Sequence, residues 1–226
     1  MSPASAVLLG LIAAGAISML AARLTDARAL VMPLILLAST SYVALGVASG
    51  GLRTAFGRVT LCGLACCWIG DAIGPGNFLF GLGAFLAGHI FFAVSFAIHG
   101  IAPRRTVVAF GVVFAVSAAV GALLWPHVPA AERVPFTAYC TVISIMLVTA
   151  ASVRPGLPLA LPAAALFYVS DVCVALWRYA DSAIDGYLCY LLYYAACALF
   201  ALNARHAAAT APGNGHDERV VDFGPI

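Results

Sequence analysis

Two aspartates interrupt segments that are otherwise apolar. Asp71 lies in LCGLACCWIGDAI, and Asp171 lies in LPAAALFYVSDVCVAL. Placing a carboxylate at the centre of a membrane helix costs about 2.5–3.5 kcal/mol on insertion scales, so such a residue indicates a functional site by default. Two carboxyl groups brought close together cannot both ionise, and the pair then shares one proton. One member can act as a general acid while the other activates water. We therefore predict Asp71 and Asp171 jointly as catalytic residues.

Other polar and aromatic side chains fall near these aspartates or deep inside apolar segments. A buried histidine can donate a hydrogen bond between helices, hold a phosphate or tune a carboxylate. A tyrosine hydroxyl at mid-membrane depth needs a partner and can orient an aspartate. The candidate substrate-binding or supporting residues are His89, Ser170, Tyr168, Tyr194, Tyr193, Trp68 and Asn77. Arg23 and Arg178 could meet a phosphate near the outer face, although anchoring of helix ends is the more ordinary role of such arginines.

The composition indicates that these residues belong to a membrane protein. The 226 residues are 64% hydrophobic and 9% charged, whereas soluble domains carry about 25% charged residues. We expect an all-α membrane protein with an eight-helix domain over residues 1–204 and a disordered cytoplasmic tail over residues 205–226. The predicted spans are 4–22, 29–49, 58–73, 78–98, 106–125, 135–153, 158–177 and 186–203, each near the length that crosses a bilayer.

The arginines predict the orientation of these spans. The side that holds both termini would carry Arg53, Arg58, Arg104, Arg105, Arg154, Arg205 and Arg219, and the other side Arg23, Arg28, Arg133 and Arg178. The positive-inside rule then makes both termini cytoplasmic, as expected for a bacterial inner-membrane protein. Spans three and seven would both run outward and place Asp71 and Asp171 at comparable depth. The segments CGLACCWIGD and PAAALFYVSD also suggest a diverged 4+4 repeat.

The sequence shows no pattern typical of a metal or cofactor site. The seven cysteines all fall in apolar segments, without the spacing of a zinc site or a disulfide framework. Ser170 lacks the GxSxG turn of a nucleophilic serine. The net charge of +2 is spread over short loops, with no cluster typical of nucleic-acid binding. We expect no metal, no cofactor and no nucleic-acid partner.

Several short motifs together resemble the YhhN-type lysoplasmalogenase family of eight-span membrane proteins. They are WIGD, F-x-x-GLGAF-x-x-GH over 78–89, ALFYVSD and YLLYYAAC, and the resemblance covers residues 5–205. One departure is Cys197, where the family pattern suggests glutamine.

The resemblance implies a hydrolase that cleaves the vinyl ether bond of lysoplasmalogens. The products would be a fatty aldehyde and a glycerophospho-alcohol, and the lysophospholipid would enter from the bilayer. Vinyl ether hydrolysis needs a proton donor to carbon and a group that activates water, which an aspartate pair can supply.

Three alternatives remain open. A proton-coupled transporter of lipids or small molecules would use the aspartates as proton carriers. An intramembrane aspartyl protease also uses two aspartates on different spans, but this chain shows no proline-rich docking motif after the second. A structural or lipid-binding protein would need the aspartates only to hold helices together.

Overall fold

Eight long α-helices make up most of the chain. The computed structural model describes residues 2–210, and within this range eight helices are long and apolar enough to span a bilayer. They are α1 (Pro3–Leu24), α2 (Arg28–Ala48), α3 (Ala55–Ile73), α4 (Phe78–His99), α5 (Pro103–Leu124), α6 (Arg133–Ser152), α7 (Ala160–Ala180) and α8 (Asp185–Thr210). Short 3₁₀ turns lie at η1 (Gly51–Arg53), η2 (Trp125–His127) and η3 (Ala130–Glu132). The expected all-α membrane architecture with eight spans is confirmed.

The helix ends differ from the predicted spans where capping residues act. The predicted third span begins at residue 58, but α3 begins at Ala55 because the Thr54 side chain accepts a hydrogen bond from the Gly57 N–H at 3.0 Å. At the other extreme, α8 continues to Thr210, past the boundary expected at residue 204. Alanine is the strongest helix former, and the segment ARHAAA carries the helix onward. The rest of the expected tail, residues 211–226, lies outside the described residues.

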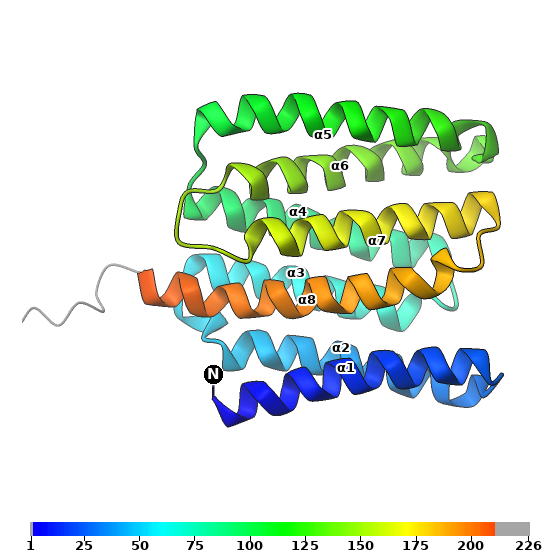
Figure 1. Cartoon of the computed structure of the whole chain (residues 1–226), viewed down its shortest axis with the longest axis horizontal. Helices are drawn as coiled ribbons and strands as arrows, with labels where there is room; N and C mark the ends of the chain where they lie inside the picture. Colours follow the sequence, from blue (N-terminus) through cyan, green and yellow to red (C-terminus); the bar gives the residue numbers. More distant parts are fainter. Residues whose placement is uncertain (1, 211–226) are drawn as a thin grey trace, which may run out of the picture.

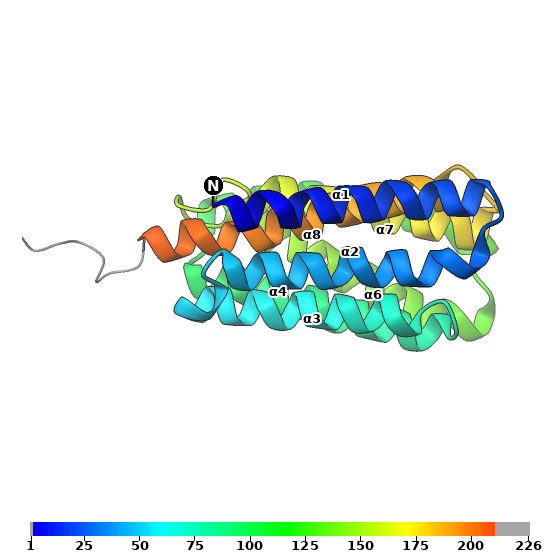
Figure 2. The ribbon, with the colours of Figure 1, turned by 90° about the horizontal axis from the view of Figure 1, so that it is seen from below.

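Consecutive helices form antiparallel hairpins in an elongated bundle (Figure 1). Helices α5 and α6 lie on one side, α1 and α2 on the other, and the remaining four fill the centre. Helix α8 packs against α7, α2, α3 and α1, whereas α5 packs mainly against α6. The start of α1 and the end of α8 lie at the same end of the bundle, as Figure 2 also shows. The predicted 4+4 repeat is not shown by this arrangement.

Small residues draw α3 and α4 together. A Cβ atom added at Gly81 would lie 2.6 Å from the Gly74 Cα, and one added at Gly88 would lie 3.0 Å from the Cys67 Sγ. Glycine at these positions lets the two helices approach closely, as small-residue faces do in membranes. This close packing holds the end of α3, which carries Asp71, against the first half of α4.

Candidate active site

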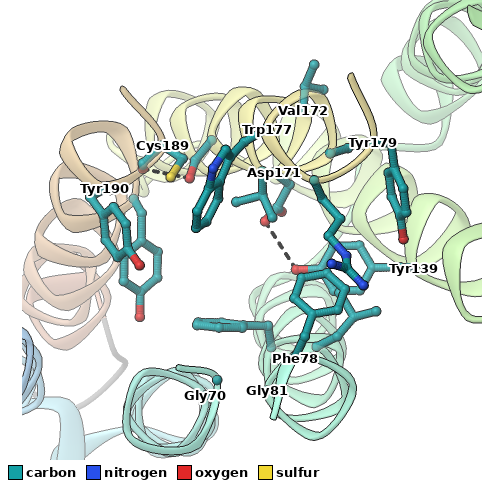
Figure 3. Close-up of a pocket in the computed structure, with 18 of the residues that line it drawn as sticks. Gly70, Phe78, Gly81, Tyr139, Asp171, Val172, Trp177, Tyr179, Cys189 and Tyr190 are labelled. Atoms are coloured by element: carbon teal, nitrogen blue, oxygen red, sulfur yellow. Dashed lines mark hydrogen bonds between the residues drawn. The ribbon is translucent and has the colours of Figure 1, made fainter. Parts of the chain in front are cut away.

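A large cavity lies among the helices and contains both predicted catalytic residues. Its volume is about 1120 Å³, and its walls include Asp71, Asp171 and residues from all eight helices. Connecting segments at the end of the bundle opposite the start of α1 and the end of α8 also line it, through Asp26, Pro75 and Asp181. The cavity therefore reaches from this end of the bundle to the two carboxylates. Figure 3 shows α7 and α8 on one side of this space and Gly70 and Gly81 on the other.

Asp71 is buried and surrounded by hydroxyl groups. Its Oδ2 atom contacts the Ser39 Oγ, lies 3.2 Å from the Tyr42 hydroxyl, and accepts a hydrogen bond from the Tyr193 hydroxyl at 2.8 Å. The Tyr42 and Tyr193 hydroxyls are also 2.9 Å apart. These partners come from α2 and α8, on which α3 packs. Three neutral hydroxyls thus converge on one carboxyl oxygen.

Asp171 has a different set of partners, supplied by α4 and α6. The Tyr139 hydroxyl donates to Asp171 Oδ1 at 3.1 Å, the bond drawn in Figure 3. The Nε2 atom of His89 lies 3.1 Å from Asp171 Oδ2 and 3.0 Å from the Tyr139 hydroxyl. His89 is fully buried, with its ring packed edge-on against Phe167 at 4.5 Å between centroids. A histidine, a tyrosine and a carboxylate therefore form a closed triangle at one wall of the cavity.

The two carboxyl groups do not share a hydrogen bond in the described part of the chain. Helix α3 packs on α4, α2 and α8, whereas α7 packs on α8, α6 and α5, so α3 and α7 are not close neighbours. The Phe167 ring lies between the two networks, 4.5 Å from the His89 ring and 5.2 Å from the Tyr193 ring. Each aspartate thus has its own network, and both line one cavity.

Four of the predicted supporting residues lie at this cavity or beside its carboxylates. Tyr193 bonds to Asp71 and His89 contacts Asp171, as described above. Tyr168 and Ser170 line the cavity but have other partners. The Tyr168 hydroxyl is 2.7 Å from the Ser117 Oγ, and the Ser170 hydroxyl donates to the Cys189 carbonyl at 2.8 Å. Ser170 therefore joins α7 to α8 and does not bind an aspartate.

The other three supporting residues are not brought to the carboxylates. Tyr194 packs its ring on Tyr193, with 4.9 Å between centroids, and forms no hydrogen bond with either aspartate. The Trp68 indole is 37% exposed on the outside of the bundle and donates to the Thr40 Oγ1 at 3.1 Å. The Asn77 side chain accepts from the Phe80 N–H at 3.2 Å and caps α4.

Sequence reasoning missed Ser39, Tyr42 and Tyr139, which complete the two networks. The segment Ser-Thr-Ser-Tyr over residues 39–42 places four consecutive hydroxyl side chains inside an apolar span. That run was a usable signal, because buried hydroxyls in a membrane need partners. No comparable run of hydroxyl residues marks Tyr139 in the sequence.

Among residues 2–210, no three His, Cys, Asp or Glu side chains gather in a way that could hold a metal ion.

A family model, that of the YhhN family, matches residues 27–204 of this chain. The chain belongs to the YhhN family. The matched segment runs from the start of α2 into α8, and it includes both aspartates and all their hydrogen-bond partners. No curated protein and no solved structure matches the chain. Membership of the YhhN family confirms the family expected from the short motifs.

Proposed function

We propose that this protein hydrolyses the vinyl ether bond of lysoplasmalogens to a fatty aldehyde and a glycerophospho-alcohol. The observation that carries the proposal is the pair of carboxyl groups with separate hydrogen-bond networks at one large intramembrane cavity. Membership of the YhhN family agrees with a hydrolase role. Both carboxyl groups line the same cavity, whose volume can hold a substrate and a water molecule.

The hydrogen-bond partners of Asp71 suit the role of general acid. The Ser39 hydroxyl has a second acceptor, the Ile35 carbonyl at 2.8 Å. When Ser39 donates its proton there, its Oγ is free to accept a proton from the Asp71 carboxyl group. Tyr42 can likewise direct its proton to the Tyr193 oxygen instead of to Asp71. The surrounding hydroxyls can therefore support a protonated Asp71 and can also donate to the carboxylate that remains after proton transfer.

The partners of Asp171 suit the role of general base. The Nδ1 atom of His89 is buried and has no hydrogen-bond partner in the described structure. An N–H at Nδ1 would be unsatisfied, so the neutral tautomer with its proton on Nε2 fits best. The His89 Nε2–H then donates to the Tyr139 oxygen, and the Tyr139 hydroxyl donates to Asp171 Oδ1. The other carboxyl oxygen, Oδ2, lies 3.1 Å from His89 Nε2 and has no hydrogen-bond partner in the described structure, so it is free to accept a hydrogen bond from water. An ionised Asp171 can accept a proton from water.

These roles give a balanced reaction. Asp71 transfers its proton to the β-carbon of the vinyl ether, and the double-bond electrons form the new C–H bond and leave an oxocarbenium ion. Water adds to that ion as Asp171 takes its proton, which gives a hemiacetal. Asp171 then returns the proton to the glycerol oxygen as the C–O bond breaks. The hemiacetal hydroxyl proton goes to Asp71, so both carboxyl groups recover their starting states and one water is consumed.

The cavity walls suit a single-chain lipid. Ile35, Phe85 and Phe167 supply apolar surface beside the two aspartates, and such surface accommodates an alkyl chain. The cavity, at about 1120 Å³, is slightly larger than the roughly 300–1,000 Å³ usual for small-molecule sites. An amphiphile could place its tail against these rings and its headgroup at the end of the bundle where the connecting segments lie.

The test is product analysis with purified protein in detergent. With a lysoplasmalogen in D₂O, we expect a fatty aldehyde that carries one deuterium on the carbon next to the carbonyl group, together with an equal amount of glycerophospho-alcohol. The saturated alkyl-ether analogue should yield no aldehyde, because it has no double bond to protonate. If the vinyl ether lipid also yields no aldehyde over a range of detergents and lipids, the hydrolase proposal is wrong. Proton flux into liposomes without lipid turnover would then favour a transporter.

A further inference from the structure

Arg23 occupies an unusual position at the mouth of the cavity, the end lined by the connecting segments. It lies in the last turn of α1 and lines the cavity. Its guanidinium carbon is 5.2 Å from the ring centroid of Trp177, 5.6 Å from that of Tyr187 and 5.1 Å from that of Tyr190. Cation–π contacts of this kind fix the position of the guanidinium group. An arginine held this way belongs to the wall of the cavity, not to the outer surface of the bundle.

The other arginines that line the cavity are neutralised by acidic partners. Arg28 Nε lies 2.6 Å from Asp26 Oδ1, and Arg178 Nη2 lies 2.9 Å from Glu132 Oε1. Within residues 2–210, Arg23 forms no ion pair, and its hydrogen bond to the Gly186 carbonyl is long at 3.4 Å. Aromatic rings attract a cation but do not cancel its charge. Arg23 therefore brings to the mouth of the cavity a positive charge that is not held in an ion pair.

We propose that Arg23 binds the phosphate group of the single-chain lipid that occupies this cavity. This inference takes its substrate class from the proposed function. A guanidinium group is planar, so rings can pack on it while its N–H groups remain directed outward along its edge. Those N–H groups match two phosphate oxygens in a bidentate contact. With the phosphate at Arg23, the rest of the lipid would extend along the cavity toward Asp71 and Asp171.

Gly186 supports this arrangement at the start of α8. A Cβ atom added there would lie 3.0 Å from three atoms of the Trp177 indole. Glycine therefore lets the indole lie close to the α8 backbone and keep its place beside Arg23. The aromatic residues around Arg23 come from α7 and α8, so the site joins three helices at the mouth of the cavity.

The test is a binding measurement that needs no turnover. A saturated alkyl-ether lysophosphoethanolamine and the matching alkylglycerol, which lacks phosphate, are titrated into purified protein by calorimetry. We expect Arg23→Gln to weaken binding of the phospholipid by at least about tenfold, because a charge-assisted bond is lost, and to leave alkylglycerol binding unchanged. Arg23→Lys should give an intermediate affinity, since it keeps the charge but not the planar fork. Arg105→Gln, at the opposite end of the bundle, is the matched control and should change neither affinity.

Competition with inorganic phosphate distinguishes a site for phosphate carried on a lipid from a site for free phosphate. Inorganic phosphate should not displace the phospholipid at millimolar concentration if the site takes phosphate carried on a lipid tail. Displacement in the parent but not in Arg23→Gln would support a site for phosphate itself. Equal losses for both lipids in Arg23→Gln, or no loss for the phospholipid, would overturn the inference. Neither lipid contains a vinyl ether, so a failure to hydrolyse lysoplasmalogen would leave this result interpretable on its own.

Discussion

At the scale of single residues, the two aspartates differ in the kind of groups that surround them. The hydrogen-bond partners of Asp71 are all hydroxyls, whereas Asp171 accepts a hydrogen bond from a tyrosine hydroxyl and lies beside the Nε2 atom of His89. Two carboxyl groups in different environments can hold different protonation states at one pH, which is how paired carboxyl groups divide acid and base roles. The sequence indicates which carboxyl groups matter. It does not indicate their partners, because Ser39, Tyr42 and Tyr139 lie on other helices, and which side chains face each other there depends on how the helices are rotated against one another.

Tyr193→Phe tests the network of Asp71. The substitution removes the hydroxyl that donates to Asp71 Oδ2 at 2.8 Å. A hydrogen bond to a charged group is worth about 1.5–3 kcal/mol, so we expect turnover of lysoplasmalogen to fall about 10–100-fold. Trp68→Phe is the control, because it removes an N–H bond to Thr40 on the outside of the bundle. Equal turnover in the parent and in Tyr193→Phe would contradict the role of this hydroxyl.

His89 substitutions test the network of Asp171. His89→Leu removes the donor that lies 3.1 Å from Asp171 Oδ2, whereas His89→Gln keeps an N–H in the side chain. Proton transfer by a positioned group contributes about 10²–10⁴-fold to rate, and we expect His89→Leu to lose much of that factor. His89→Gln should retain more activity than His89→Leu in the aldehyde assay. The reverse order of the two variants would count against a hydrogen-bonding role for His89.

At the scale of helices, the α3–α4 hairpin fixes the depth and direction of Asp71. The seven-residue spacing of Gly81 and Gly88 places both on one face of α4, and the structure shows close packing on α3 at both positions. The packing of α7 was not predictable in the same way. Short connections predict α6 and α8 as its neighbours, but its apolar residues could face lipid or protein, and nothing in the sequence indicates that α5 would also pack on it.

Two neighbouring glycines on α4 allow a matched test of this packing. A Cβ at Gly81 would meet the Gly74 backbone at 2.6 Å, whereas a Cβ at Gly83 meets nothing within 4 Å. We expect Gly81→Ala to lower the free energy of unfolding by about 1–3 kcal/mol, as overpacking does. Gly83→Ala should be neutral or stabilising by up to about 1 kcal/mol, since alanine favours helix. Thermal unfolding in detergent measures both. Similar stabilities for the two variants would argue against close packing at Gly81.

At the scale of the whole molecule, the count of eight spans and their order followed directly from hydropathy. This prediction succeeds because a bilayer admits few structures and each span must satisfy its own backbone hydrogen bonds. The shared cavity could not be predicted, because it depends on how eight helices pack together. The start of α1 and the end of α8 lie at the same end of the bundle, as an even number of spans requires.

The arginine distribution makes a prediction about orientation. We propose that both ends of the chain are cytoplasmic, because the end of the bundle with the start of α1 and the end of α8 has more of the arginines near helix ends. A fluorescent protein fused to the C-terminus should then fluoresce in a bacterial host, and alkaline phosphatase fused at the same point should be inactive. The opposite pattern for the two fusions would reverse the orientation and place the mouth of the cavity in the cytoplasm.

The most direct test of the account measures aldehyde release from lysoplasmalogen by the parent protein, Asp71→Asn and Asp171→Asn. Each variant keeps the size of its side chain but cannot transfer the proton that we assign to it. We expect activity in the parent and a loss of about 10²–10⁴-fold in each variant. Thermal unfolding should show that both variants are folded, and both should still bind the saturated ether lipid. A folded variant that releases aldehyde at close to the parent rate would show that its aspartate is not catalytic and would contradict the division of acid and base roles.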